Sequence, residues 1–136
     1  LRLGLLCGEP ELINEIDKLR LPYNINVLTQ YTANLILSNA GFLESQAEMI
    51  RADRDHLLHQ LSQLEQVEAF PSQANFILFR LKQVNATDVF DRLRADGVLI
   101  KNMDKPGPLA NCLRVTVGTA EENQVFMRAL EKALRS

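Results

Sequence analysis

The sequence has 136 residues and a net charge of −2, with 46% hydrophobic and 24% charged residues. These values are typical of one soluble globular domain that is long enough to bury a hydrophobic core. Because no basic stripe occurs and the longest apolar runs are short, we expect neither nucleic acid nor a membrane as a partner.

The cysteines and histidines favour a reducing, cytoplasmic location and no metal site. Cys7 and Cys112 lie in apolar, strand-like contexts, where we expect small buried side chains. His56 and His59 have no third ligand nearby, so both are expected to be solvent-exposed helix residues.

The start of the chain, LRLGLLCGEP, does not have the pattern of a signal peptide. The chain lacks an initiating methionine and begins within a strand-like pattern. We therefore expect it to be a piece of a longer protein.

Residues 1–41 are expected to be a remnant of a larger domain. Residues 2–7 have the pattern of a strand, and the sequence EPE at 9–11 opens a helix, since proline suits a first turn and acids its positive end. After a break at Pro22, a second helix is predicted from about Leu28 to Ser38.

Residues 42–66 are expected to form a long interdomain helix. Their apolar positions follow a three-four rhythm. A helix of roughly 25 residues would be about 37 Å long, which exceeds what a domain of this size covers. We therefore expect it to bridge two bodies or to pack on something outside the chain.

Residues 67–136 are predicted to form a small C-terminal domain with the order β-β-α-β-β-α. Asn85 is expected to cap its first helix, which ends at Gly97, and Thr119 and Glu122 fit a capping box at the start of the last helix. Strands are predicted at 74–81, 98–103 and 111–119. The fold class is α/β, as an α+β small domain with its helices on one face of a sheet.

The strand predicted at 111–119, NCLRVTVGT, carries the most prominent candidate residue. Leu113, Val115 and Val117 alternate with a second side that includes Arg114. A guanidinium presents a flat fork of donors suited to a carboxylate or a phosphate. From the residues alone, Arg114 is as well explained by a solvent-facing surface charge.

Three further residues could bind a ligand, and each has a simpler explanation. Arg2 could hold a phosphate or be a surface charge. Lys101 could join Arg114 at a site for a doubly charged anion, or be an edge-strand lysine that discourages aggregation. Asn75 could bind a ligand or, as we favour, hydrogen-bond the turn after Pro71. No acid–base pair, Ser/His/Asp set or phosphate-binding glycine loop is visible in the sequence, so these residues could bind anions, but none is expected to perform bond chemistry unaided.

Five segments together resemble a known enzyme family. They are LRLG at the start, LRLPYNINVLTQ at 19–30, SQANFILFR at 72–80, GVLIKNM at 97–103 and NCLRVTVGTAEEN at 111–123. Essentially the whole chain is similar to the C-terminal part of the histidinol-phosphate aminotransferases, and the last segment is the most specific.

The resemblance implies a homodimeric fold-type I enzyme that depends on pyridoxal 5'-phosphate. It also implies amino transfer between L-glutamate and imidazole acetol phosphate in histidine biosynthesis. Arg2 then matches the arginine that binds the cofactor phosphate, shortly after a Schiff-base lysine that falls before Leu1, so this piece alone is expected to be inactive. Arg114 matches the arginine that takes the substrate carboxylate or phosphate in turn.

Lys101 departs from the family pattern, because familiar members have a second arginine there for the substrate phosphate. A lysine keeps the charge but loses the bidentate fork. The substrate-binding candidates are therefore Arg114, Lys101 and Asn75. A related aminotransferase, a pyridoxal-phosphate-dependent decarboxylase of phospho-amino acids and a stand-alone anion-binding domain stay open as alternatives.

Overall fold

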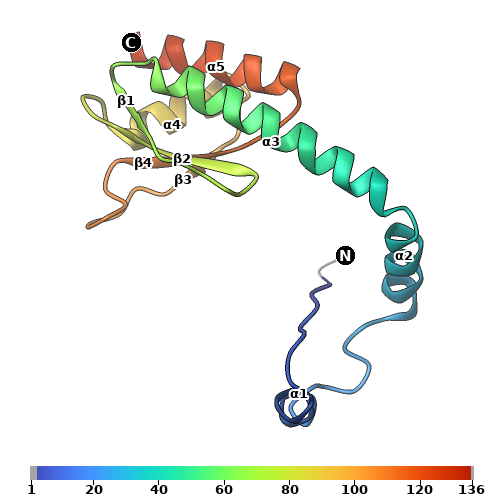
Figure 1. Ribbon diagram of the computed structural model, residues 1–136. Coiled ribbons are helices and arrows are strands. Elements are labelled where there is room, and N and C mark those ends of the chain that lie inside the picture. Colours follow the sequence, from blue (N-terminus) through green and yellow to red (C-terminus); the bar gives the residue numbers. More distant parts are fainter. Residues whose placement is uncertain (1–2, 136) are drawn as a thin grey trace. The chain divides into compact units, whose positions relative to one another are not determined.

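The computed structural model describes residues 3–135. The chain divides into two compact units, with the boundary between Ser45 and Gln46. The helices are α1 (Pro10–Asp17), α2 (Val27–Leu37), α3 (Ala40–Ser62), α4 (Ala86–Ala95) and α5 (Ala120–Arg135), and the strands are β1 (Val67–Ala69), β2 (Phe76–Leu81), β3 (Lys101–Asn102) and β4 (Cys112–Thr116) (Figure 1). The assignment of residues 1–41 to a larger domain and of 42–66 to a connector stays a prediction.

The first unit contains the two short helices that the sequence predicts. Pro10 occupies the first turn of α1, where its missing N–H removes no hydrogen bond. Helix α2 begins after Asn26, whose side chain accepts a hydrogen bond of 2.9 Å from the Thr29 N–H. The first-turn proline of α1 and the side-chain cap of α2 therefore account for where the two helices begin.

The predicted strand at 2–7 is wrong for its described part, because residues 3–9 form neither helix nor strand. Cys7 is exposed there, not buried as its apolar neighbours indicated. A strand requires a partner for its backbone donors and acceptors, and none of the described residues pairs with this segment.

No side chain is buried among the described residues of the first unit. Its apolar side chains are largely exposed, up to 98% for Tyr23. Other strongly exposed members are Leu5, Leu6, Leu19, Leu21, Val27, Leu28 and Tyr31. This unit therefore has no hydrophobic core of its own among the described residues.

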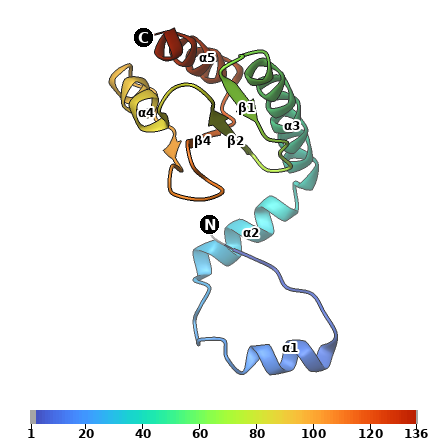
Figure 2. The same cartoon turned by 90° about the vertical axis from the view of Figure 1, so that its left-hand side faces the viewer.

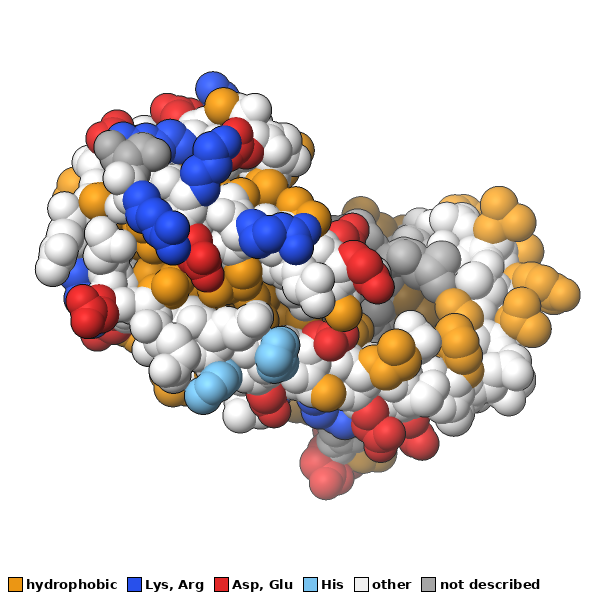
Figure 3. Space-filling model, turned by 90° about the horizontal axis from the view of Figure 1, so that it is seen from above, with side chains coloured by type: hydrophobic (Ala, Val, Ile, Leu, Met, Phe, Trp, Pro, Cys, Tyr) orange, Lys and Arg blue, Asp and Glu red, His pale blue; other side chains and the backbone are white. Residues whose placement is uncertain are grey.

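Helix α3 begins and ends earlier than predicted. Its buried side chains are Arg54, Leu57 and Leu61, all in its second half. The predicted apolar stripe is thus buried only where a sheet lies beneath it. His56 and His59 are exposed on this helix as expected, and Figure 3 shows the two histidine side chains at the surface.

The second unit contains a four-stranded antiparallel sheet in the order β1-β2-β4-β3. The predicted element order β-β-α-β-β-α is confirmed. In the central pair, Leu78 lies opposite Arg114, and at the β3 edge Lys101 also lies opposite Arg114. Strand β3 is shorter than predicted, since residues 98–100 do not join the sheet.

Helices α4, α5 and the second half of α3 cover one face of this sheet (Figures 1 and 2). Phe79 from β2 and Phe126 from α5 meet in the core, with ring centroids 6.2 Å apart. The largest fully buried side chains are Phe79, Leu57, Leu61, Ile77, Leu81, Leu93, Leu113, Leu130, Val89 and Cys112. The predicted burial of Cys112 and the predicted helices on one face are both confirmed.

The predicted helix caps in this unit are confirmed. Asn85 accepts hydrogen bonds from the backbone at the start of α4, and Gly97 ends that segment with a φ of +81°. At the start of α5, the Thr119 N–H donates to Glu122 Oε2 at 2.8 Å, and the Glu122 N–H donates to Thr119 Oγ1 at 3.3 Å. This reciprocal pair is a capping box.

Candidate anion-binding site on the open sheet face

Arg114 lies in the middle of β4 and faces away from the core, as the alternation predicts. Its neighbours Leu113 and Val115 are 0% and 4% exposed, whereas Arg114 is half-buried. The guanidinium carbon lies 4.8 Å from the ring centroid of Phe76, the first residue of β2. This stacking supports the flat face of the guanidinium.

The donors of Arg114 have no acceptor among the described residues. Its Nε atom is fully buried and makes no hydrogen bond. No carboxylate lies within ion-pair distance of this guanidinium in the described part of the chain. A buried donor without an acceptor costs about 1–3 kcal/mol, so this arginine needs a partner that the described residues do not supply.

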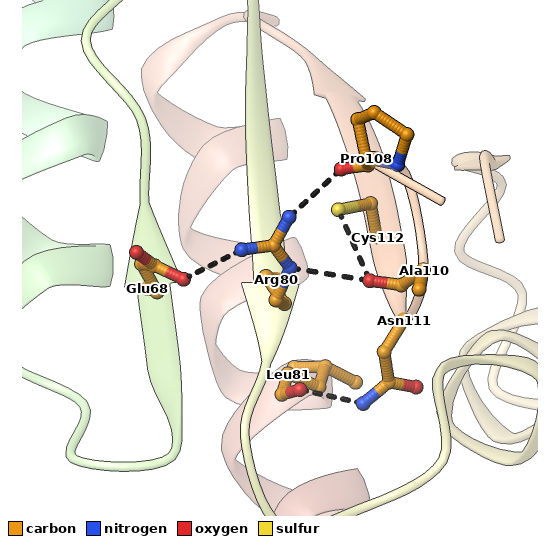
Figure 4. Close-up of polar contacts among 7 residues, drawn as sticks. All are labelled: Glu68, Arg80, Leu81, Pro108, Ala110, Asn111 and Cys112. Carbon is orange, nitrogen blue, oxygen red and sulfur yellow. Dashed lines mark hydrogen bonds and ion pairs between the residues drawn. The ribbon is translucent and has the colours of Figure 1, made fainter. Parts of the chain in front are cut away.

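Arg80 provides the contrast, since it lies on the same face of the sheet in β2. Its Nη1 donates to Glu68 at 3.1 Å, its Nη2 to the Pro108 carbonyl at 2.8 Å and its Nε to the Ala110 carbonyl at 3.2 Å (Figure 4). Each of the three guanidinium nitrogen atoms of Arg80 therefore has a hydrogen-bond acceptor. Arg80 is a structural arginine that fastens the loop at 104–110 to the sheet.

Lys101 lies directly across from Arg114 in the antiparallel pair of β3 and β4. Residues directly opposite each other project from the same face, with Cβ atoms about 5 Å apart. Lys101 is exposed and makes no ion pair with any described residue. The structure thus brings the two predicted cations together on one open face.

Asn75 is exposed just before β2, and its carbonyl accepts a hydrogen bond of 2.9 Å from the Val117 N–H. The favoured turn role of its side chain is wrong, because Ser72 makes those bonds instead. Ser72 Oγ donates to the Phe76 carbonyl at 2.6 Å and accepts from the Ala74 N–H at 3.1 Å. Contact of the Asn75 side chain with a ligand stays a prediction.

Arg2, the predicted contact of a cofactor phosphate, lies outside the described residues. In the second unit, a cavity of about 580 Å³ lies between residues 97–100, the end of β4 and the first turns of α5. Neither Arg114 nor Lys101 lines it. The candidate site is therefore the sheet face around these two cations and not this cavity.

Two residues that sequence reasoning missed are Asn111 and Asn123. The segment that contains them is the most specific part of the resemblance, yet neither received a role. Asn111 adopts a φ of +58° at the start of β4, and Asn123 is 7% exposed in α5. Asparagine tolerates positive φ better than most residues, which is the one signal that could have pointed to Asn111.

Comparisons with known proteins agree with this architecture. The model of the family "Aminotransferase class I and II" matches residues 1–130. Histidinol-phosphate aminotransferase 2 of Nitrosococcus oceani is 49% identical over 132 residues, which are 96% of this chain and 37% of that protein. Histidinol-phosphate aminotransferase of Aquifex aeolicus is 38% identical over 137 aligned positions, covering 100% of this chain and 38% of the relative.

Solved structures share the fold. The histidinol-phosphate aminotransferase of Clostridium acetobutylicum superimposes with a TM-score of 0.82 at 23% identity, over 92% of this chain and 38% of its own. The L-threonine-O-3-phosphate decarboxylase of Porphyromonas gingivalis gives a TM-score of 0.81 at 24% identity, over 95% of this chain and 40% of its own. The predicted fold class is confirmed, and the chain spans about 37% of the curated relatives that it matches. This chain belongs to the aminotransferase class I and II family.

Proposed function

We propose that these residues are the C-terminal part of a pyridoxal-phosphate-dependent aminotransferase. The proposed reaction is amino transfer between L-glutamate and imidazole acetol phosphate, the reaction of a histidinol-phosphate aminotransferase. The relatives that carry this name and are 46–49% identical to the chain support the proposal. It concerns the whole polypeptide, of which the chain covers about 37% in those relatives.

The observation that carries the proposal is the pair of cations on the open sheet face. Arg114 and Lys101 lie directly opposite each other, an arrangement that is destabilising for like charges. No described acid neutralises them, and the Arg114 Nε lacks an acceptor. A bound carboxylate or phosphate relieves the repulsion and accepts hydrogen bonds from the guanidinium.

In this proposal, one arginine serves both substrates. Arg114 binds the α-carboxylate of glutamate in one half-reaction and the phosphate of the histidinol substrate in the other. Lys101 adds a second positive charge, which favours the doubly charged phosphate over the singly charged carboxylate. Asn75 is a further candidate for a substrate contact.

Pyridoxal 5'-phosphate is the proposed cofactor, and when bound it acts as an electron sink. Of the contacts that the resemblance implies for it, Arg2 lies outside the described residues. The described residues therefore have a different task, which is to bind and orient the anionic end of the substrate.

We also propose that the whole protein acts as a homodimer in the cytoplasm. The family resemblance supports the dimer, and the apolar side chains exposed in the first unit are of the kind that a larger assembly covers. In the described part of the chain, no helix is both long and apolar enough to cross a bilayer.

The test is steady-state kinetics of the full-length enzyme with L-glutamate and imidazole acetol phosphate. Arg114→Ala is expected to raise KM for both substrates by at least about tenfold, since charge-assisted hydrogen bonds contribute roughly 1.5–3 kcal/mol each. A rise for only one substrate would contradict the shared site. Turnover of an aromatic keto acid with no turnover of imidazole acetol phosphate would contradict the proposed substrate.

A second candidate, decarboxylation of a phospho-amino acid, is favoured by one observation. Lys101 stands where the family resemblance implies an arginine for the substrate phosphate. The fold itself is shared with both kinds of enzyme and does not distinguish them. The same enzyme preparation distinguishes the two functions. Release of carbon dioxide from L-threonine-O-3-phosphate, with no amino transfer from glutamate, supports the decarboxylase.

A further inference from the structure

We propose that Asn111 and Asn123 are positioning residues that fasten the two ends of β4 and so set the direction in which Arg114 points. The inference rests on the proposed role of Arg114 in binding the anionic end of the substrate. In this role the two asparagines influence substrate binding without contacting the substrate themselves.

Asn111 fastens the start of β4 to three backbone groups from elsewhere in the unit. Its Nδ2 donates to the Leu81 carbonyl at 2.5 Å and to the Val84 carbonyl at 2.8 Å. Its Oδ1 accepts a hydrogen bond of 2.7 Å from the Ala86 N–H, at the first residue of α4. Both ends of the amide are therefore used, and they join β4 to the end of β2 and to α4.

The backbone of Asn111 is held as well. Its N–H donates to Asp104 Oδ1 at 2.6 Å, and its carbonyl accepts from the Leu81 N–H at 3.0 Å. Its φ of +58° lies in the left-handed region, which few residues other than glycine and asparagine adopt readily. Glycine would keep this backbone but lose the three side-chain bonds, which makes Asn111→Gly an informative variant.

The loop that leads into Asn111 is itself fastened. Arg80 donates to the carbonyls of Pro108 and Ala110 from the neighbouring strand, as Figure 4 shows together with the Asn111 side chain. Two sets of hydrogen bonds therefore hold the segment that precedes β4. Those of Arg80 lie on the open face, and those of Asn111 lie at the start of the strand.

Asn123 fastens the other end of β4 from the first turns of α5. Its Oδ1 accepts from the Gly118 N–H at 3.0 Å, and its Nδ2 donates to the Gly118 carbonyl at 3.1 Å. Asparagine is suited to this task because it carries an acceptor and two donors on one rigid amide. With an exposure of 7%, the side chain has these bonds shielded from water.

Arg114 lies between these two fastened ends. On one side Arg114 pairs with Leu78 of β2, but on the other side β4 has only the very short strand β3 as its neighbour. A shift of one residue in the register would turn Arg114 toward the core. Smaller movements would displace its guanidinium from the Phe76 ring, on which it now stacks. The two asparagines oppose both kinds of movement.

The experiment is a set of double-mutant cycles in the full-length enzyme, with KM and kcat measured for both proposed substrates. Asn111→Gly and Asn123→Asp are each expected to raise both KM values about fivefold, because a small misplacement of a binding group weakens binding strongly. In the Arg114→Ala background, the same substitutions should raise KM no further. Thermal unfolding should still show their loss of stability in both backgrounds.

Asn85→Ala is the matched control. Asn85 is also an asparagine that accepts backbone hydrogen bonds in this unit, at 2.8 and 3.2 Å, but it caps α4 and does not hold β4. Its substitution should lower thermal stability and leave both KM values within about twofold of the wild type. If Asn111→Gly does not accumulate as folded protein, the cycle with Asn123→Asp tests the inference by itself. We expect that variant to fold, because it keeps the hydrogen bond from the Gly118 N–H.

Two results overturn the inference. One is a loss of stability without any change in KM, as expected of purely structural residues. The other is an equal rise in KM with and without Arg114. If Arg114→Ala itself leaves both KM values unchanged, the proposed function is wrong. The single variant shows this result, so it is distinguishable from a failure of the inference about the asparagines.

Discussion

Arg80 and Arg114 show how the same residue type serves two purposes on one face of a sheet. The guanidinium of Arg80 donates to one carboxylate and two carbonyls, whereas that of Arg114 has no acceptor among the described residues and faces Lys101. Both stack on a phenylalanine ring, at 5.2 and 4.8 Å. The two arginines are therefore alike in their stacking and differ in the hydrogen-bond acceptors that their guanidinium groups contact.

This difference predicts different effects of the two alanine substitutions on stability. Arg80→Ala should lower the free energy of unfolding by about 1–3 kcal/mol, because it leaves the Pro108 and Ala110 carbonyls without their donor. The ion pair with Glu68 adds little, since it is partly exposed. Arg114→Ala should be neutral or slightly stabilising, because it removes a like-charge contact and a donor without an acceptor.

Urea denaturation of the two full-length variants, followed by circular dichroism, measures the difference. Each variant serves as the control for the other, since the substitution and the sheet face are the same. An Arg114→Ala variant as unstable as Arg80→Ala would mean that Arg114 supports the fold, which contradicts its role as a ligand-binding residue.

At the scale of elements, the junction between β4 and α5 depends on a close contact at Gly118. A Cβ atom added there would lie 2.5 Å from Glu122 Oε2 and 3.0 Å from Glu122 Cβ. The Glu122 carboxylate cannot move away freely, because it accepts the Thr119 N–H in the capping box. The helix cap therefore requires glycine at position 118.

Gly118→Ala is therefore expected to destabilise the protein by about 1 kcal/mol, which is typical for the loss of a helix cap. The combination with Glu122→Ala should be less than additive, since alanine lacks the carboxylate that makes both the 2.5 Å contact and the bond from the Thr119 N–H. A double-mutant cycle of thermal unfolding free energies measures this coupling. Strict additivity of the two substitutions would show that the contact with Glu122 is not the cause.

At the scale of the whole molecule, the two units differ in what stabilises them. The second unit buries a continuous core between its helices and sheet, whereas the first buries no described side chain. Helices α1 and α2 have only 8 and 11 residues. Helices shorter than about 12–15 residues are marginal in water without tertiary packing.

Hydrogen exchange of the isolated 136-residue chain is expected to reflect this difference. The backbone amides of α1 and α2 should exchange close to the unprotected rate, while those of β2, β4 and α5 should be the slowest. Mass spectrometry of peptic peptides measures it, with the same peptides from the full-length protein as the control. Equal protection of α2 and α5 in the isolated chain would contradict the expectation.

Features that depend on neighbours along the chain could be predicted from the sequence. The caps at Asn85, Gly97 and Thr119 involve residues within four positions, so their partners are visible in the sequence itself. The alternation along β4 likewise indicates that Arg114 faces away from the core, because side chains of a strand alternate strictly.

Features that depend on distant partners could not be predicted. The strand expected at 2–7 requires a pairing partner that no described residue provides, and Cys7 is exposed for the same reason. Asn111 binds groups 25 to 30 residues away, and the acceptors of Arg80 in the 104–110 loop lie 28 and 30 residues along the chain. No local pattern reveals such contacts.

The sequence by itself determined the order of the elements in the second unit, the side of the sheet that carries Arg114 and the family resemblance, since these depend on periodicity and on short motifs. Tertiary structure decided which arginine is structural and which has no acceptor, because acceptors come from residues brought together only by folding. It also decided that Lys101 lies opposite Arg114, because strand register is a property of paired strands and not of either strand alone.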